Sequence, residues 1–144
     1  MTPEEKQQFV DQALAMHTKG FNCAQCVAVA TCGQVGLDPD ATFRIMEGFG
    51  AGMGGITQTC GALSGAVAVV SQASSNGMEA CNSKKITYGW VGQLPWKFQQ
   101  QFGSCICADI RPEEPELRMP VCNKYIAACV EMALDMIEEV KASK

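Results

Sequence analysis

The centre of this sequence is the segment Gly48–Met78, which reads GFGAGMGGITQTCGALSGAVAVVSQASSNGM. It contains no Asp, Glu, Lys, Arg or His residue. Its first part is rich in glycine, and its second part, Ala62–Val70, is almost wholly apolar. Because a helix that is apolar on all sides has to be buried, the segment predicts a glycine loop followed by a central helix from near Thr59 to about Ser74.

Cys60 lies where this helix is expected to begin. Thr57 or Thr59 is the expected N-cap, since a threonine hydroxyl accepts a hydrogen bond from the first backbone N–H groups of a helix. Cys60 would then lie in the first turn, where unpaired N–H groups and the positive end of the helix dipole stabilise an anionic sulfur. We therefore expect its pKa to be lowered and its sulfur to serve as a metal ligand or a nucleophile.

The composition predicts one folded domain, residues 1–144. Hydrophobic residues make up 47% of the chain and charged residues 18%, which is typical of a globular protein. The net charge of −4 and the absence of a basic stripe argue against nucleic acid as a partner. The N-terminus lacks the features of a signal peptide, and no apolar run is long enough to cross a membrane. We therefore expect no membrane insertion and a cytoplasmic location.

Helix signals along the chain predict an all-α fold, a single compact helical domain of about five to six helices. Besides the central helix, the expected helices begin at Thr2, Asn22, Asp38, near Ser83 and at Pro120. The helix over residues 83–102 contains Pro95, where a kink or break is expected. The segment 111–120 carries three prolines and is expected to be a surface loop. No stretch alternates cleanly as a β-strand.

Nine cysteines are the unusual feature of the composition. The number is odd, so the chain cannot form a complete set of internal disulfides. In a reducing cytoplasm, clustered cysteines indicate metal binding or redox chemistry more often than structural bridges. Four of the cysteines lie at expected helix starts or in a turn, namely Cys23, Cys60, Cys107 and Cys122.

If these helix ends converge, four thiolates meet the positive ends of several helix dipoles. Such a site suits a cofactor that carries net negative charge, such as an iron–sulfur cluster of the 4Fe–4S or 2Fe–2S type. Glycine allows the backbone to approach a cluster closely, and its N–H groups can hydrogen-bond the sulfides. The candidate glycines of the loop are Gly50, Gly52, Gly54 and Gly55.

Several segments together match a known pattern. They are Cys60-Gly61-Ala62-Leu63-Ser64-Gly65, Gly20–Gln25, Gly48–Gly54, Phe102–Cys107, and Cys122 with Tyr125. With these segments the chain resembles the C_GCAxxG_C_C family, which is defined by four cysteines and a Cys-Gly-Ala-x-x-Gly motif and described as redox-active. The resemblance implies a small all-helical protein of anaerobic bacteria or archaea. It also implies a redox role and an iron–sulfur site, similar to the cluster-bearing part of split-Soret cytochromes, and it adds Gly61 to the candidate cofactor-binding glycines.

The other cysteines leave alternatives open. Cys26, Cys32 and Cys129 have apolar neighbours and are expected in the core. Cys105 competes with Cys107 as the third ligand. A dithiol at Cys23 and Cys26 would make the protein a thiol–disulfide oxidoreductase, and a zinc or iron binding module is a further alternative.

We predict a redox-active iron–sulfur protein that transfers electrons or senses redox state through a cluster held by the four cysteines. The competing classes are an enzyme, in the form of an oxidoreductase, and a metal-binding module. The expected partners are a redox partner protein and a second copy of the chain, with Trp90 and Trp96 as candidates for the apolar contact between copies.

Overall fold

The first two helices begin at the caps that the sequence predicts. In the computed structural model, which describes residues 1–144, α1 spans Pro3–Lys19 and α2 spans Cys23–Thr31. Each starts with a capping box, in which the N-cap and the third helical residue exchange hydrogen bonds, and the caps are Thr2 and Asn22. α1 ends at Gly20 in the left-handed conformation, as is common at helix C-termini.

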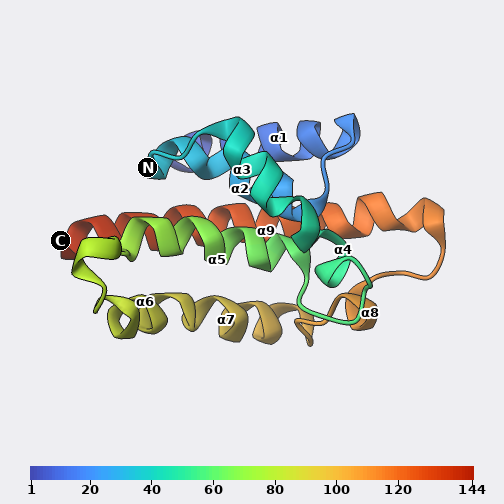
Figure 1. Ribbon diagram of the computed structural model, residues 1–144. Coiled ribbons are helices and arrows are strands. Elements are labelled where there is room, and N and C mark those ends of the chain that lie inside the picture. Colours follow the sequence, from blue (N-terminus) through green and yellow to red (C-terminus); the bar gives the residue numbers. More distant parts are fainter.

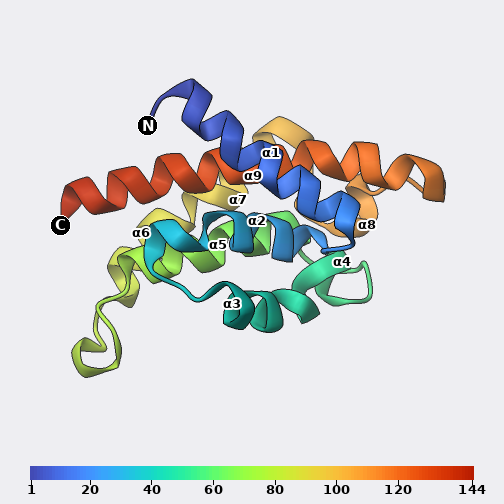
Figure 2. The ribbon, with the colours of Figure 1, turned by 90° about the horizontal axis from the view of Figure 1, so that it is seen from above.

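The central helix α5 spans Gly61–Ser74 and packs against helices on both sides. In Figure 1, α5 runs alongside the long helix α9, Pro115–Ser143, between an upper layer of α1, α2 and α3 and a lower layer of α6 and α7. Figure 2 shows α1 crossing α9, and α2 beside α5. The side chains of Leu63, Val69 and Val70 are almost fully buried, so the prediction of a central, buried helix is confirmed.

The fold is all-α, as predicted. The remaining helices are α3 (Pro39–Met46), α4 (Gly50–Met53), α6 (Lys84–Val91), α7 (Gln93–Phe102) and α8 (Cys107–Ile110), with 3₁₀ turns at Cys32–Val35, Glu47–Phe49 and Met78–Ala80. There is no strand, and the one β-bridge is isolated, between Thr59 and Ile106. No helix combines the length and apolar character that a bilayer span requires. The number of helices exceeds the expected five to six because the helix predicted over residues 83–102 is divided and because α4 and α8 form short helices of four residues each.

The predicted break lies at Gly92, three residues before Pro95, and Pro95 itself does not interrupt a helix. α6 ends at Val91, and α7 begins at Gln93. Pro95 is therefore the third residue of α7. In the first turn the backbone N–H has no partner within the helix, so a proline there removes no hydrogen bond.

The prediction of a surface loop over residues 111–120 was wrong in its second half. α9 begins at Pro115 and contains Pro120 within its second turn. Proline is well suited to the first helical position, because its missing N–H would have no partner there. As a result, Cys122 lies about two turns inside α9 and not at its start.

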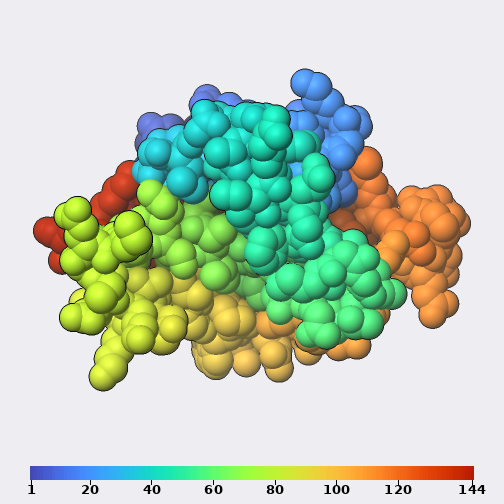
Figure 3. All heavy atoms as spheres, in the orientation of Figure 1, coloured from blue at the N-terminus to red at the C-terminus, as the bar shows by residue number.

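The glycine loop, which includes the short helix α4, lies at the surface. Figure 3 shows it, in green, next to the orange N-terminal part of α9. Residues 53–58 are exposed, whereas Gly50 and Gly52 are buried beneath them. The loop therefore has an exposed outer part and a buried inner part.

Candidate functional site

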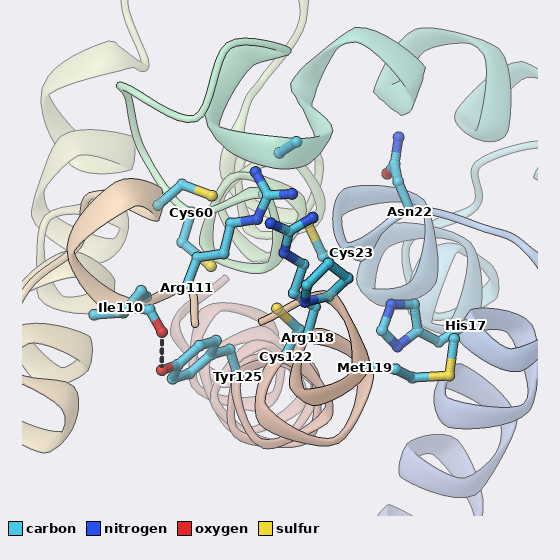
Figure 4. Close-up of a pocket in the computed structure, with 14 residues that line it drawn as sticks. His17, Asn22, Cys23, Cys60, Ile110, Arg111, Arg118, Met119, Cys122 and Tyr125 are labelled. Carbon is cyan, nitrogen blue, oxygen red and sulfur yellow. Dashed lines mark hydrogen bonds between the residues drawn. The ribbon is translucent and has the colours of Figure 1, made fainter. Parts of the chain in front are cut away.

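One cavity of about 350 Å³ is lined by all four predicted cysteines. Cys23 comes from the first residue of α2, and Cys60 immediately precedes α5. Cys107 begins α8, and Cys122 projects from α9. Figure 4 shows this cavity with its lining side chains. Chain segments that are far apart in the sequence thus place four thiols around one space.

Backbone hydrogen bonds fix Cys60 and Cys107 relative to each other. The N–H of Cys60 donates to the carbonyl of Cys105 at 2.7 Å, and the N–H of Cys107 donates to the carbonyl of Gln58 at 2.9 Å. A third bond joins the N–H of Ala108 to the carbonyl of Ile56 at 2.7 Å. These bonds connect the end of the glycine loop to the start of α8, so two of the four thiols belong to one rigid unit.

Cys60 is the N-cap of α5, one position before the predicted first turn, and neither threonine caps the helix through its side chain. The expected lowering of its pKa was wrong. Burial raises the pKa of the Cys60 thiol to about 12, and the neighbouring Cys23 adds to this rise. The backbone N–H groups of Leu63 and Ala62 act in the opposite direction. The helix end does stabilise the thiolate, but desolvation is the larger effect.

The pKa values of two other cavity thiols are also raised. Burial raises the pKa of Cys122 to about 11 and also raises the pKa of Cys107. Arg111 opposes both rises, and Arg118 opposes that of Cys122. In the metal-free protein these sulfurs are therefore protonated at neutral pH.

Of the five candidate glycines, only Gly61 lines the cavity. A Cβ atom at Gly61 would collide with the Sγ of Cys23. Gly50 and Gly52 do not line the cavity but pack against residues that do. A Cβ atom at Gly50 would collide with Asn22, and a Cβ atom at Gly52 would lie 2.6 Å from the Cβ of Cys107.

The last two loop glycines have no such role. A Cβ atom at Gly54 or Gly55 would meet no atom within 4 Å. Gly54 still has a positive φ of 81° and ends α4. The glycine loop therefore divides into a part that packs against cavity residues and a part that only turns the chain.

Three residues of the loop that are not glycine have positive φ angles. They are Ala51 at 50°, Met53 at 66° and Ile56 at 61°. This conformation is unfavourable for residues with a Cβ atom, and most of all for a β-branched one such as Ile56. Backbone strain of this kind is concentrated at functional sites. Ala51 lines the cavity, and no sequence signal pointed to it.

A comparison with known protein families shows which family the chain belongs to. A family model described as "Putative redox-active protein (C_GCAxxG_C_C)" matches residues 21–136. The chain belongs to the C_GCAxxG_C_C family. A search of curated proteins and a search of solved structures each gave no match.

The C_GCAxxG_C_C match includes all four cysteines of the cavity and leaves α1 outside. The matched residues include the segment Cys60-Gly61-Ala62-Leu63-Ser64-Gly65. The structure explains why a glycine follows Cys60 here, since Gly61 leaves room for the sulfur of Cys23.

The remaining cysteines do not line the cavity of this C_GCAxxG_C_C protein. Cys26, Cys32 and Cys129 are buried at 0%, 2% and 0% exposure, which confirms their assignment to the core. The thiol of Cys105 donates to the carbonyl of Pro95 at 3.3 Å. Cys81 is exposed, and all nine cysteines are free thiols.

Sequence reasoning missed the basic side chains of the cavity. Arg111 and Arg118 both line it, and both are half-buried. His17 also lines it, and its Nδ1 lies 2.6 Å from the Oδ1 of Asn123. Both arginines lie within the segment 111–120, which was expected to be a surface loop, so the sequence carried no signal for their position.

The candidate donors of the cavity are its four thiols. No three Cys, His, Asp or Glu side chains lie close enough together to hold a single metal ion. The four thiols instead surround a space, and soft thiolate ligands are those that iron–sulfur clusters use. Two half-buried arginines add positive charge next to the thiols.

Proposed function

We propose that this member of the C_GCAxxG_C_C family is a redox protein that holds an iron–sulfur cluster in its cysteine-lined cavity. Cys23, Cys60, Cys107 and Cys122 would be the ligands, and the cluster would be of the 4Fe–4S or 2Fe–2S type. The observation that carries the proposal is that these four thiols, from four separate segments, line one cavity. When bound, the cluster would accept and donate single electrons, for electron transfer or redox sensing.

The description of the family favours a cluster over a zinc ion. The family is described as redox-active, whereas a zinc ion has no redox chemistry. An iron–sulfur cluster held by cysteine thiolates does supply such chemistry.

The protein contributes surroundings as well as ligands. Burial makes the anionic form of Cys60 and Cys122 unfavourable in the absence of a positive partner, and a metal supplies that partner by displacing the thiol protons. Arg111 and Arg118 add positive charge at the same cavity. The hydroxyl of Tyr125 donates to the carbonyl of Ile110 at 2.7 Å and so ties α8 to α9.

The raised pKa values disfavour the alternative of a thiol–disulfide oxidoreductase. The attacking species in disulfide exchange is the thiolate, and such enzymes lower the pKa of their reactive cysteine. In the Cys23–Cys26 pair, the thiol of Cys26 lies in the core, and burial raises its pKa to about 12. Only Cys23 of that pair lines the cavity.

Purification without oxygen tests the proposal. We expect a brown protein that contains iron and acid-labile sulfide, and we expect the same iron content in Cys81→Ser, because Cys81 is exposed and away from the cavity. A colourless protein that takes up no metal on anaerobic reconstitution would contradict the cluster and favour thiol chemistry. Stoichiometric zinc without iron would favour a metal-binding module.

We further propose a cytoplasmic role in an anaerobic organism, with a redox partner protein and self-association through apolar surface. Trp96 is 65% exposed and supports such a contact. Trp90 packs against the core and is therefore removed from the proposed contact. Light scattering should give the mass of a dimer for the wild type, and Trp96→Ala should shift it towards the monomer.

A further inference from the structure

Two arginines at the cysteine-lined cavity have no counter-charge within the protein. Arg111 and Arg118 are half-buried, and neither belongs to any of the three ion pairs of the chain. The only other arginine, Arg44, is exposed and pairs with Asp40 at 2.8 Å. Partly buried charges are normally paired, so the two cavity arginines indicate a missing anionic partner.

The two guanidinium groups are held in different ways. Arg118 donates from Nε to the carbonyl of Pro112 at 3.3 Å and from Nη2 to the carbonyl of Glu113 at 2.9 Å. These bonds anchor one edge of the group and leave Nη1 available. Arg111 makes no hydrogen bond from its guanidinium to the protein. Figure 4 shows both side chains reaching into the space between Cys60 and Cys23.

Acidic residues nearby do not neutralise the arginines. The segment between them contains Glu113, Glu114 and Glu116, all of which are exposed, and none lies within ion-pair distance of either guanidinium. The whole chain carries a net charge of −4, so the positive charge of the two cavity arginines is not part of a generally basic chain. The segment therefore holds its two arginines inward and its carboxylates in solvent.

The cavity has the size and chemistry of a small-molecule site. Its volume of about 350 Å³ lies at the lower end of the range typical of ligand pockets. Paired guanidinium groups recognise carboxylates and oxyanions through charge-assisted, bidentate hydrogen bonds. His17 lines the same cavity, and its Nε2 remains available because the bond to Asn123 uses Nδ1.

We propose that Arg111 and Arg118 bind a small anion, either a carboxylate or an inorganic oxyanion, at the mouth of the cysteine-lined cavity. The anion would lie beside the redox centre, as a substrate or an effector of that centre would. This anion site depends on the proposed function in one respect only, namely that the group beside the anion is a redox-active cluster. The binding of the anion rests on the two arginines and can be measured on its own.

The test is anion binding by the full chain, purified without oxygen and studied by isothermal titration calorimetry in the cluster-loaded form and in the metal-free form. Inorganic phosphate represents the oxyanions and malonate the carboxylates, and the tighter of the two identifies the class. We expect saturable binding of at least one probe by the loaded protein. Arg111→Gln and Arg118→Gln should each weaken it by at least about tenfold, through the loss of charge-assisted hydrogen bonds.

Arg44→Gln is the matched control and should bind as the wild type does, because Arg44 lies outside the cavity. Arg118→Lys keeps the charge but loses the planar fork, and it serves as the test if Arg118→Gln fails to fold, with weakened binding again expected. Helicity by circular dichroism checks the fold of each variant.

Three results would overturn the anion site. They are the absence of saturable binding of both probes in both forms, an equal loss in Arg44→Gln, and, where a cluster-loaded form is obtained, binding by the metal-free form that the loaded form does not show. The last would mean that the arginines only balance the charge of the cluster. If the protein takes up no iron and still binds anions through Arg111 and Arg118, the cluster proposal fails and the anion site stands. If it holds iron and binds neither probe, the reverse is true.

Discussion

Cys122 and Cys129 lie on the same helix, seven residues apart, and yet they have different surroundings. Cys129 is fully buried in the core, whereas Cys122 is half-buried and lines the cavity with Cys23, Cys60 and Cys107. Residues seven apart project from nearly the same face of a helix. The difference therefore comes from what faces that side, which is other core side chains in one case and the ends of α2, α5 and α8 in the other.

The largest expected effect separates a cavity cysteine from a core cysteine. Cys60→Ser should lose nearly all iron, whereas Cys129→Ser should keep it and lose about 1–3 kcal/mol of stability, because a hydroxyl is buried among apolar groups. Iron and sulfide analysis measures the first effect, and urea unfolding of the metal-free protein measures the second. Equal loss of iron in the two variants would mean that the distinction between cavity and core is wrong.

The next comparison decides between two neighbouring cysteines. Cys107→Ser should lose iron, because Cys107 lines the cavity. Cys105→Ser should keep it, because the thiol of Cys105 bonds the carbonyl of Pro95 and a serine hydroxyl can do the same. Iron content after anaerobic reconstitution is the measurement. Loss of iron in Cys105→Ser alone would move the third ligand to Cys105.

A single methyl group next to a cavity sulfur should have a smaller but clear effect. Gly61→Ala places a Cβ atom on the Sγ of Cys23, so iron content should fall several-fold. Alanine favours a helix by about 1 kcal/mol relative to glycine, so a general loss of helix stability cannot explain the fall. Gly55→Ala is the control, since its Cβ atom meets nothing within 4 Å. Unchanged iron in Gly61→Ala would show that Cys23 is not held at that position.

Two glycines with positive φ angles allow the effect of backbone strain to be distinguished from the effect of contact with the site. Gly52 and Gly54 both have positive φ, at 59° and 81°, so valine at either position is strained by about 1 kcal/mol or more. Only Gly52 lies against Cys107. Gly52→Val should therefore reduce iron content while Gly54→Val keeps most of it, with helicity by circular dichroism near wild type in both. An equal reduction would assign the effect to strain alone.

The last comparison concerns the stability of the metal-free protein at alkaline pH. The pKa of Cys60 is raised from an ordinary value of 9.0 to about 12, so the unfolded chain loses this proton at lower pH than the folded protein does. The stabilisation is complete below about pH 9 and is lost as the pH rises towards about 12, with a slope approaching 1.4 kcal/mol per pH unit for each such thiol. Urea unfolding across this range should show a shallower loss for Cys60→Ala than for the exposed control Cys81→Ser. Equal slopes would contradict the raised pKa.

Local sequence predicted what local interactions decide. The capping residues Thr2 and Asn22 begin α1 and α2, and Gly20 ends α1, because a cap satisfies N–H or carbonyl groups within a few residues. The apolar run after Cys60 predicted the central helix, because a helix without a polar face has to be buried. The choice of four cysteines out of nine came from the same local reasoning, together with the family resemblance.

The prolines mark the limit of that reasoning. Pro95 and Pro120 were expected to interrupt or begin a helix, but one lies in the first turn of α7 and the other within α9. Whether a proline ends a helix depends on what the rest of the helix gains by packing. Here α9 packs along α5, and the long apolar contact outweighs one missing hydrogen bond.

The sequence alone determined where most helices begin, that the core contains one apolar helix, and that Cys23 and Cys60 stand at helix starts. Only the tertiary structure decided that four thiols share a cavity, that burial raises the pKa of Cys60, and that Arg111 and Arg118 lie beside it. The physical reason is the range of the interactions. Caps and helical periodicity act within one or two helical turns. Desolvation and charge pairing depend on neighbours from distant parts of the chain, which come together only when α9 and the glycine loop pack over the ends of α2 and α5.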